Sequence, residues 1–144
     1  MKVGQAMTRG AHLVKASDSI KQAAKIMAEE DVGFLPVEEN DRLVGTLTDR
    51  DIVVRCLAKG GNGDARVRDA MTKDIKYCFD DEDVDHVMTN MGDIQVRRLP
   101  VMNRDKRLVG VFTIADAVLN YSPDSAGDAL SGICSPGGMH AGGG

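Results

Sequence analysis

The sequence contains no tryptophan, and aromatic residues amount to only 3% of its 144 residues. Apolar residues still make up 42% of the chain, so a buried core is available, but it has to be aliphatic and rich in methionine. No run approaches the roughly 20 apolar residues of a membrane span, and the N-terminus lacks the apolar segment of a signal peptide. We therefore expect a cytoplasmic protein that makes no contact with membranes.

Basic excess and cysteine pairs are also absent. The formal net charge is −4, and a nucleic-acid surface requires a basic excess or a basic stripe, so we expect no nucleic-acid partner. The three cysteines (Cys56, Cys78 and Cys134) are odd in number, widely spaced and without a CxxC pair. This pattern argues against a secreted disulfide scaffold.

The most informative feature that is present is an internal duplication. Short segments of the first half recur in the same order about 64 residues later, with one inserted residue between the second and third matches. The matching pairs are residues 3–8 and 67–72, 35–37 and 99–101, 42–45 and 107–110, Thr48 and Thr113, and Asp51 and Asp116. Matches in this order with a single slip indicate two copies of one unit.

Each copy predicts the same elements in the order β-α-β-β-α. An apolar stripe at helical spacing is followed by a strand containing Leu-Pro-Val, a polar turn, an apolar strand and a second helix. In the first copy these are Ile20, Ala23, Ala24, Met27 and Ala28, strands 33–37 and 43–47, and helix 51–57. In the second they are Val84, Val87, Met88 and Met91, strands 97–101 and 108–112, and helix 115–119. A proline inside a strand favours an edge or an end of the ladder.

Composition divides the chain into a first repeat (3–59), a linker (60–66), a second repeat (67–121) and a tail (122–144). The tail holds seven of the sixteen glycines, so we expect it to be flexible and dispensable for folding. A repeat of about 60 residues buries little surface alone. The two copies are expected to pack about a pseudo-twofold axis and to leave a cleft at the joint.

These residues resemble the tandem CBS domain, or Bateman module, a family named after cystathionine β-synthase. The resemblance is carried by the duplicated Ala-Met-Thr and Leu-Pro-Val segments and by residues 43–52 with 108–117. The Ile-Cys-Ser-Pro run at 133–136 is also similar to stand-alone members called hypoxic response proteins. The resemblance implies paired α/β repeats and often a homodimer of pairs. It also implies binding of AMP, ADP, ATP or S-adenosylmethionine as a regulatory ligand, with no required cofactor, no catalysis and a separate regulated partner.

Thr48 and Asp51 are the best candidates for the ligand site in the first copy, because they lie where an apolar strand meets a helix start. The resemblance implies that the Thr48 hydroxyl reaches a phosphate and that Asp51 accepts hydrogen bonds from the ribose hydroxyls. Arg50 adds a cation for the phosphates.

Thr113 and Asp116 are the equivalents in the second copy, but isoleucine and alanine replace the aspartate and arginine between them. Positive charge there has to come from elsewhere, with Arg97 or Arg98 on the preceding strand as candidates. We therefore expect the second site to bind a polyphosphate less well than the first.

The adenine is expected to lie against residues 14–16, including Val14 and Ala16, and in the second copy against residues 77–79, including Tyr77. Apolar residues at these positions are also compatible with plain core. Similarly, Thr-x-x-Asp at a helix start is a capping box, which needs no ligand.

Two further function classes follow from these alternatives. A ligand-free module that only mediates assembly is favoured if both Thr-x-x-Asp segments merely cap helices. A small thiol- or metal-dependent protein is the weakest class, because the histidines (His12, His86 and His140) and the cysteines show no tight ligand spacing. Cys56 is expected to be a buried thiol and Cys134 to be exposed.

Overall fold

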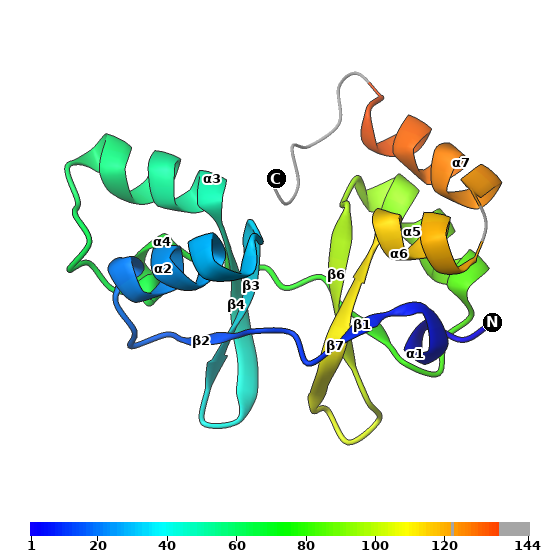
Figure 1. Cartoon of the computed structure of the whole chain (residues 1–144), viewed down its shortest axis with the longest axis horizontal. Helices are drawn as coiled ribbons and strands as arrows, with labels where there is room; N and C mark the ends of the chain where they lie inside the picture. The colour runs from blue at the N-terminus through cyan, green and yellow to red at the C-terminus, as the bar shows by residue number, and fades with distance from the viewer. Residues whose placement is uncertain (122, 136–144) are drawn as a thin grey trace. The chain divides into compact units, whose positions relative to one another are not determined.

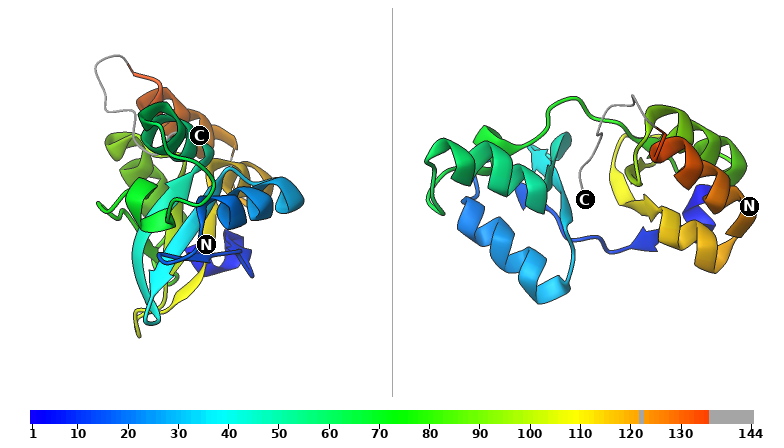
Figure 2. Two further views of the ribbon diagram at one scale, coloured as in Figure 1. Left: turned by 90° about the vertical axis from the view of Figure 1, so that its left-hand side faces the viewer. Right: turned by 90° about the horizontal axis from the view of Figure 1, so that it is seen from above.

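The computed structural model describes residues 1–121 and 123–135, which form two compact units (Figure 1). Unit 2 comprises His12–Ile75, and unit 1 comprises Met1–Ala11 together with the described chain from Lys76 onward. In each unit the helices lie on one face of a sheet, and the core fills the space between them (Figure 2). The predicted α/β class and the repeated order of elements are confirmed.

Unit 2 contains a three-stranded sheet in the order β2-β3-β4. The short β2 (Val14–Lys15) runs parallel to β3 (Phe34–Glu39), which pairs antiparallel with β4 (Arg42–Thr48). Helix α2 (Ile20–Glu30) connects β2 to β3. Its N-terminus is fixed by Ser19, whose hydroxyl accepts the Gln22 N–H at 3.1 Å, as in a capping box.

A second helical segment of unit 2 follows β4 directly. It begins as α3 (Asp49–Asp51), continues as the π-helical turn η1 (Ile52–Cys56) and ends as the 3₁₀ turn η2 (Leu57–Lys59). The predicted helix over residues 51–57 is therefore present. The one-turn helix α4 (Val67–Ala70) completes the unit.

Unit 1 repeats this arrangement with a four-stranded sheet in the order β1-β7-β6-β5. Its elements are α1 (Val3–Ala6), β1 (Thr8–Arg9), β5 (Cys78–Phe79), α5 (Val84–Ile94), β6 (Arg98–Met102), β7 (Leu108–Thr113), α6 (Ile114–Asn120) and α7 (Pro123–Ile133). Strand β5 is parallel to β6, and β7 is antiparallel to both β6 and β1.

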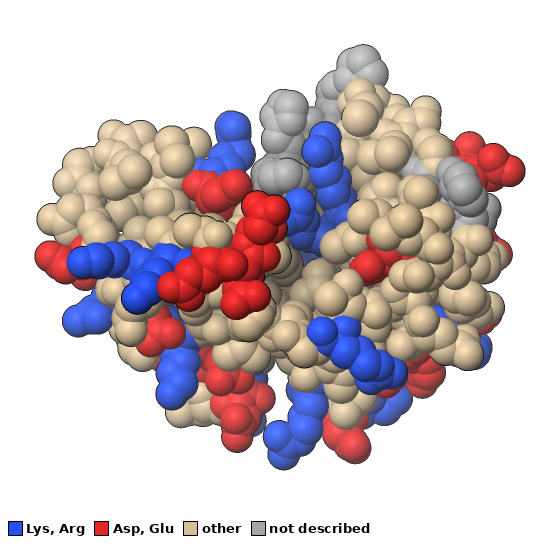
Figure 3. All heavy atoms as spheres, in the orientation of Figure 1, with Lys and Arg blue, Asp and Glu red and all other residues tan. Residues whose placement is uncertain are grey.

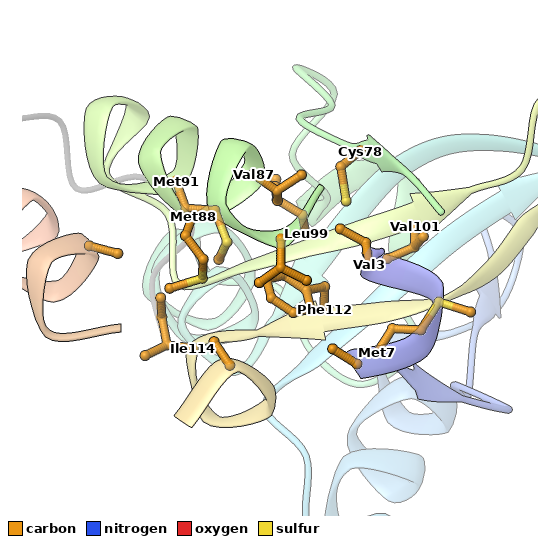
Figure 4. Close-up of a cluster of buried hydrophobic side chains, with 14 of the residues drawn as sticks. Val3, Met7, Cys78, Val87, Met88, Met91, Leu99, Val101, Phe112 and Ile114 are labelled. Carbon is orange, nitrogen blue, oxygen red and sulfur yellow. The ribbon is translucent and has the colours of Figure 1, made fainter. Parts of the chain in front are cut away.

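Aliphatic and methionine side chains make up both cores, as predicted from the shortage of aromatic residues. In unit 1 Phe112 is surrounded by Leu99 from β6, Met88 and Met91 from α5, and Val3 from α1 (Figure 4). The whole predicted stripe of α5 is buried. The stripe predicted for α2 is too wide, because Ala24 and Ala28 are exposed and only Ile20, Ala23 and Met27 are buried.

Each compact unit combines the body of one sequence repeat with the first segment of the other. Helix α1 comes from the start of the first repeat but packs in unit 1, where the Val3 N–H donates to the Glu82 carbonyl at 2.9 Å. Helix α4 comes from the start of the second repeat but packs in unit 2, where the Val67 N–H donates to the Asp18 carbonyl at 2.8 Å. The spatial units thus do not coincide with the sequence repeats.

The prolines of the two Leu-Pro-Val segments lie in central strands, which corrects the prediction of an edge or strand-end position. Pro36 pairs with Thr46 of β4 on one side, and Pro100 pairs with Val111 of β7. On the other side of β3, the short strand β2 begins only opposite Val37. Pro36 is tolerated because β2 does not pair with it, so its missing N–H interrupts no ladder on that side of β3.

The prediction of a flexible tail is wrong for Pro123–Ile133, which forms helix α7. Ala129 is buried against α5, and the Gln95 side chain donates to the Gly132 carbonyl at 2.9 Å. The glycine content of the tail predicts a loop, but Gly132 of α7 and Gly92 of α5 instead let two helices approach closely. A Cβ on Gly132 would lie 2.7 Å from the Gly92 carbonyl oxygen. Pro136 and the residues after it lie outside the described chain.

Within residues 1–121 and 123–135, no helix has the length and apolar character needed to cross a membrane.

Candidate functional site

The candidate site of the first copy is built where β4 ends and α3 begins. Thr48 is buried and caps the helix: its hydroxyl accepts the Asp51 N–H at 3.0 Å, and the Asp51 Oδ2 accepts the Thr48 N–H at 3.0 Å. This reciprocal pair is a capping box. It holds the Asp51 side chain in a fixed orientation, with one carboxylate oxygen left over.

The second copy forms the same arrangement between β7 and α6. The Thr113 hydroxyl accepts the Asp116 N–H at 3.0 Å, and the Asp116 Oδ2 accepts the Thr113 N–H at 3.0 Å. Both predicted Thr-x-x-Asp pairs are thus brought together as the sequence indicated. Both are also consistent with the alternative that these residues only cap helices, because each box forms from protein groups alone.

The remaining carboxylate oxygen, Oδ1 of Asp51 and of Asp116, has a different neighbour in each copy. In the first copy the Arg55 Nε lies 3.7 Å from the Asp51 Oδ1, one helical turn away. In the second copy the Thr8 hydroxyl donates to the Asp116 Oδ1 at 3.0 Å. Neither Arg55 nor Thr8 is among the site residues predicted from the sequence. The i,i+4 spacing from Asp51 could have indicated Arg55. Thr8 becomes a neighbour of Asp116 only because the first segment of the first repeat packs in unit 1, with the second repeat.

The positive charge near each site comes from different elements in the two copies. In the first copy Arg50 lies exposed on α3, beside Thr48. In the second copy Arg98 of β6 lies directly opposite Thr113 in the ladder, and the Arg97 carbonyl accepts the Ile114 N–H at 3.1 Å. The backbone of both predicted arginines therefore lies at the strand end beside Thr113, and their role as a source of positive charge stays a prediction.

The residues proposed to contact adenine lie in unlike surroundings. Val14 and Ala16 are buried in the core of unit 2, so their side chains already have apolar partners there. Tyr77 in unit 1 is 49% exposed and its ring lies nearly perpendicular to that of Phe79, with ring centroids 5.6 Å apart. Of these three residues, Tyr77 is the one with an exposed side chain.

Arg104 covers the Phe79 ring, with its guanidinium carbon 3.9 Å from the ring centroid. Two hydrogen bonds of 2.8 Å tie the guanidinium to Asp81. These hydrogen bonds, together with the charge of Arg104, lower the pKa of Asp81 below its ordinary value. The Phe79 ring thus already contacts two protein groups, the Arg104 guanidinium over one face and the Tyr77 ring.

Charged side chains of both signs are interspersed over the face shown in Figure 3.

Within the described residues no group of three or more histidine, cysteine or acidic side chains could hold a metal ion. Cys56 and Cys78 are buried and Cys134 is exposed. Burial, with the nearby charges of Glu82 and Asp80, raises the pKa of Cys78 to about 12. His140 lies outside the described residues.

Comparison with known proteins identifies relatives over most of the chain. CBS domain protein YhcV of Bacillus subtilis is 34% identical over 132 residues, which cover 91% of this chain and 94% of the relative. Hypoxic response protein 1 of Mycobacterium tuberculosis is 35% identical over 132 residues, covering 90% of this chain and 92% of the relative. The predicted similarity to hypoxic response proteins is confirmed.

Solved structures with the same fold include ligand complexes. The structure of hypoxic response protein I with two coordinated zinc ions is 34% identical (TM-score 0.76, 83% of this chain and 98% of that one). CBSX2 in complex with AMP is 30% identical (TM-score 0.71, 82% and 93%). The CBS domain pair of MJ0100 with 5′-methylthioadenosine and S-adenosylmethionine is 28% identical (TM-score 0.74, 85% and 100%).

The CBS domain model matches this chain twice, over residues 3–57 and 67–122, so the duplication found in the sequence is a duplication of this domain. The chain belongs to the CBS domain family, as a tandem pair.

Proposed function

We propose that this protein is a regulatory module that binds an adenosine nucleotide, such as AMP, ADP or ATP, and acts on a separate protein without catalysing a reaction itself. The observation that carries the proposal is the duplicated Thr-x-x-Asp pair, in which a capping box fixes a carboxylate that keeps acceptor capacity. In the first copy a cation, Arg55, also lies 3.7 Å from this carboxylate. Binding of AMP by CBSX2, and of two adenosine compounds by the MJ0100 pair, supports this ligand class.

In the first site Asp51 accepts the ribose hydroxyls, which are neutral donors matched to a carboxylate. The Thr48 hydroxyl and the Arg50 guanidinium meet the phosphate, because a guanidinium forms strong charge-assisted hydrogen bonds to phosphate oxygens. The adenine lies against the chain around Val14 and Ala16. Together such contacts are compatible with micromolar affinity, which corresponds to about −8 kcal/mol.

In the second site Thr113 and Asp116 take the same roles, Arg97 and Arg98 supply the positive charge, and the adenine lies by Tyr77. The two sites need not be equivalent. S-adenosylmethionine is the alternative ligand, since it offers the same adenosine but no phosphate.

A ligand-free assembly module is the second candidate. It is supported by the capping boxes, which are complete from protein groups alone. Exposed apolar residues on the second helical segment of each repeat support self-association, and we propose a homodimer with C2 symmetry. These residues are Val53, Val54, Leu57, Val118 and Leu119. Light scattering at micromolar concentration should then give twice the chain mass of 15.4 kDa.

Isothermal titration calorimetry with AMP, ADP, ATP and S-adenosylmethionine tests the nucleotide function. Asp51→Ala should weaken binding at the first site at least tenfold. Asp49→Ala is the matched control, because Asp49 is an exposed carboxylate two residues away that takes no part in the capping box. Heat from none of the four ligands would reject nucleotide sensing and leave the assembly module.

A further inference from the structure

The carboxylate of Asp116 is held by donors from two distant parts of the chain. Its Oδ2 accepts the N–H of Thr113, three residues earlier, and its Oδ1 accepts the hydroxyl of Thr8, both at 3.0 Å. Thr8 belongs to the first sequence repeat, whereas Asp116 belongs to the second. Thr8 reaches this position because β1 pairs with β7, with Thr8 opposite Val111, two residues before Thr113.

We propose that Thr8 is a positioning residue of the second nucleotide site, supplied by the opposite repeat. This inference rests on the proposed function, in which Asp116 accepts the ribose hydroxyls. A carboxylate oxygen can accept two hydrogen bonds, so each oxygen of Asp116 retains one acceptor position. The two existing donors fix the rotation of the carboxylate before the ligand arrives. Less ordering is then required on binding.

The first copy lacks this contact, although it has the equivalent threonine. Thr72 exchanges backbone hydrogen bonds of 3.0 and 2.8 Å with Thr46, just as β1 pairs with β7. Among the described residues, however, no hydrogen bond joins the Thr72 side chain to Asp51. Asp51 instead has Arg55 at 3.7 Å, a distance beyond that of a hydrogen bond.

The helix position of Arg55 is occupied in the second copy by Asn120, whose amide donates to the Ala6 carbonyl at 3.1 Å. Asn120 therefore binds the segment that carries Thr8 and leaves the Asp116 carboxylate to the Thr8 hydroxyl. Arg55 likewise donates to the segment that carries Thr72, through the Met71 carbonyl at 3.2 Å. The two copies therefore differ at the carboxylate itself: Asp51 has a cation nearby, whereas Asp116 accepts a hydrogen bond from a neutral hydroxyl of the other repeat.

The test measures AMP binding by calorimetry in an Asp51→Ala background, so that the second site is observed alone. Thr8→Val keeps the side-chain shape but removes the hydroxyl, and should weaken binding roughly fivefold, as expected for the loss of one ordinary hydrogen bond at an exposed position. Thr8→Ser restores the hydroxyl and should bind within twofold of Thr8. Thr8 is exposed, so the melting temperatures of the variants should agree closely.

Thr72→Val in an Asp116→Ala background is the matched control and should leave binding at the first site unchanged. Equal or tighter binding by Thr8→Val would overturn the proposal, since the hydroxyl would then be idle or in competition with the ribose. Equal weakening by Thr8→Val and Thr8→Ser would also overturn it. Absence of binding to the parent proteins of both series would instead reject the proposed function.

Discussion

Val67→Ala tests the exchange of first segments between the two units. Val67 begins the second sequence repeat, yet its side chain is fully buried in the core of unit 2, among residues of the first repeat. If the repeats folded as separate sequence units, the substitution would destabilise the second repeat. In the structure described above, it must destabilise the first.

The expected loss can be worked from the burial. The substitution removes two methyl groups, each worth about 0.8 kcal/mol when fully buried. The cavity that remains adds a smaller amount. A total of about 2 kcal/mol corresponds to a roughly 30-fold change in an opening equilibrium, since 1.36 kcal/mol is tenfold.

Native-state hydrogen exchange followed by NMR resolves the two units separately. The amides of Ala23 and Leu47 should exchange roughly 30-fold faster in Val67→Ala, because both lie in unit 2. The amides of Val87 and Phe112 in unit 1 should change little. Val3→Ala is the mirror variant and should produce the reverse pattern. Faster exchange in unit 1 alone for Val67→Ala would refute the exchange of segments.

Other predictions concern the tail, the thiols and one ion pair. Gly132→Ala should displace α7 and lower the melting temperature by several degrees, because the added Cβ would lie 2.7 Å from the Gly92 carbonyl oxygen. Gly127→Ala meets no atom within 4 Å and should leave the melting temperature unchanged or raise it slightly; equal effects would contradict the docking of α7. A thiol reagent at pH 8 should label Cys134 quickly and Cys78 only after unfolding, since Cys78 is buried with a pKa of about 12. Asp81 has a lowered pKa in the folded state, so its small contribution to stability should be present above pH 4 and lost as the pH falls through that lowered value. In Asp81→Asn the melting temperature should therefore fall less steeply as the pH is lowered below 4. An unchanged pH dependence of the melting temperature would contradict the ion pair.

Elements with a strong local signal were predictable from the sequence. The buried stripe of α5 follows from apolar residues at helical spacing, and Thr48 with Asp51 follows from a box whose two partners are three residues apart. In both cases the interacting groups are neighbours along the chain. The duplication then assigned the same roles to Thr113 and Asp116.

Contacts between distant segments were not predictable in the same way. The segments 3–8 and 67–72 carry nearly the same residues, so local pattern alone does not indicate which repeat each one joins. The Thr8–Asp116 hydrogen bond depends on that choice and was missed with it. Helix α7 was missed for a different reason: Gly132 serves a close helix contact, but a glycine has the same composition signal in a loop.

An NMR titration of the protein with AMP tests the nucleotide site most directly, because the backbone amides of Thr48 and Asp51 are themselves members of the capping box. Both amide signals should shift saturably as AMP is added, with the same midpoint as the calorimetric binding curve, and the shifts should vanish in Asp51→Ala. Saturable binding that leaves the Thr48, Asp51, Thr113 and Asp116 amides unmoved would contradict a nucleotide site at the Thr-x-x-Asp pairs.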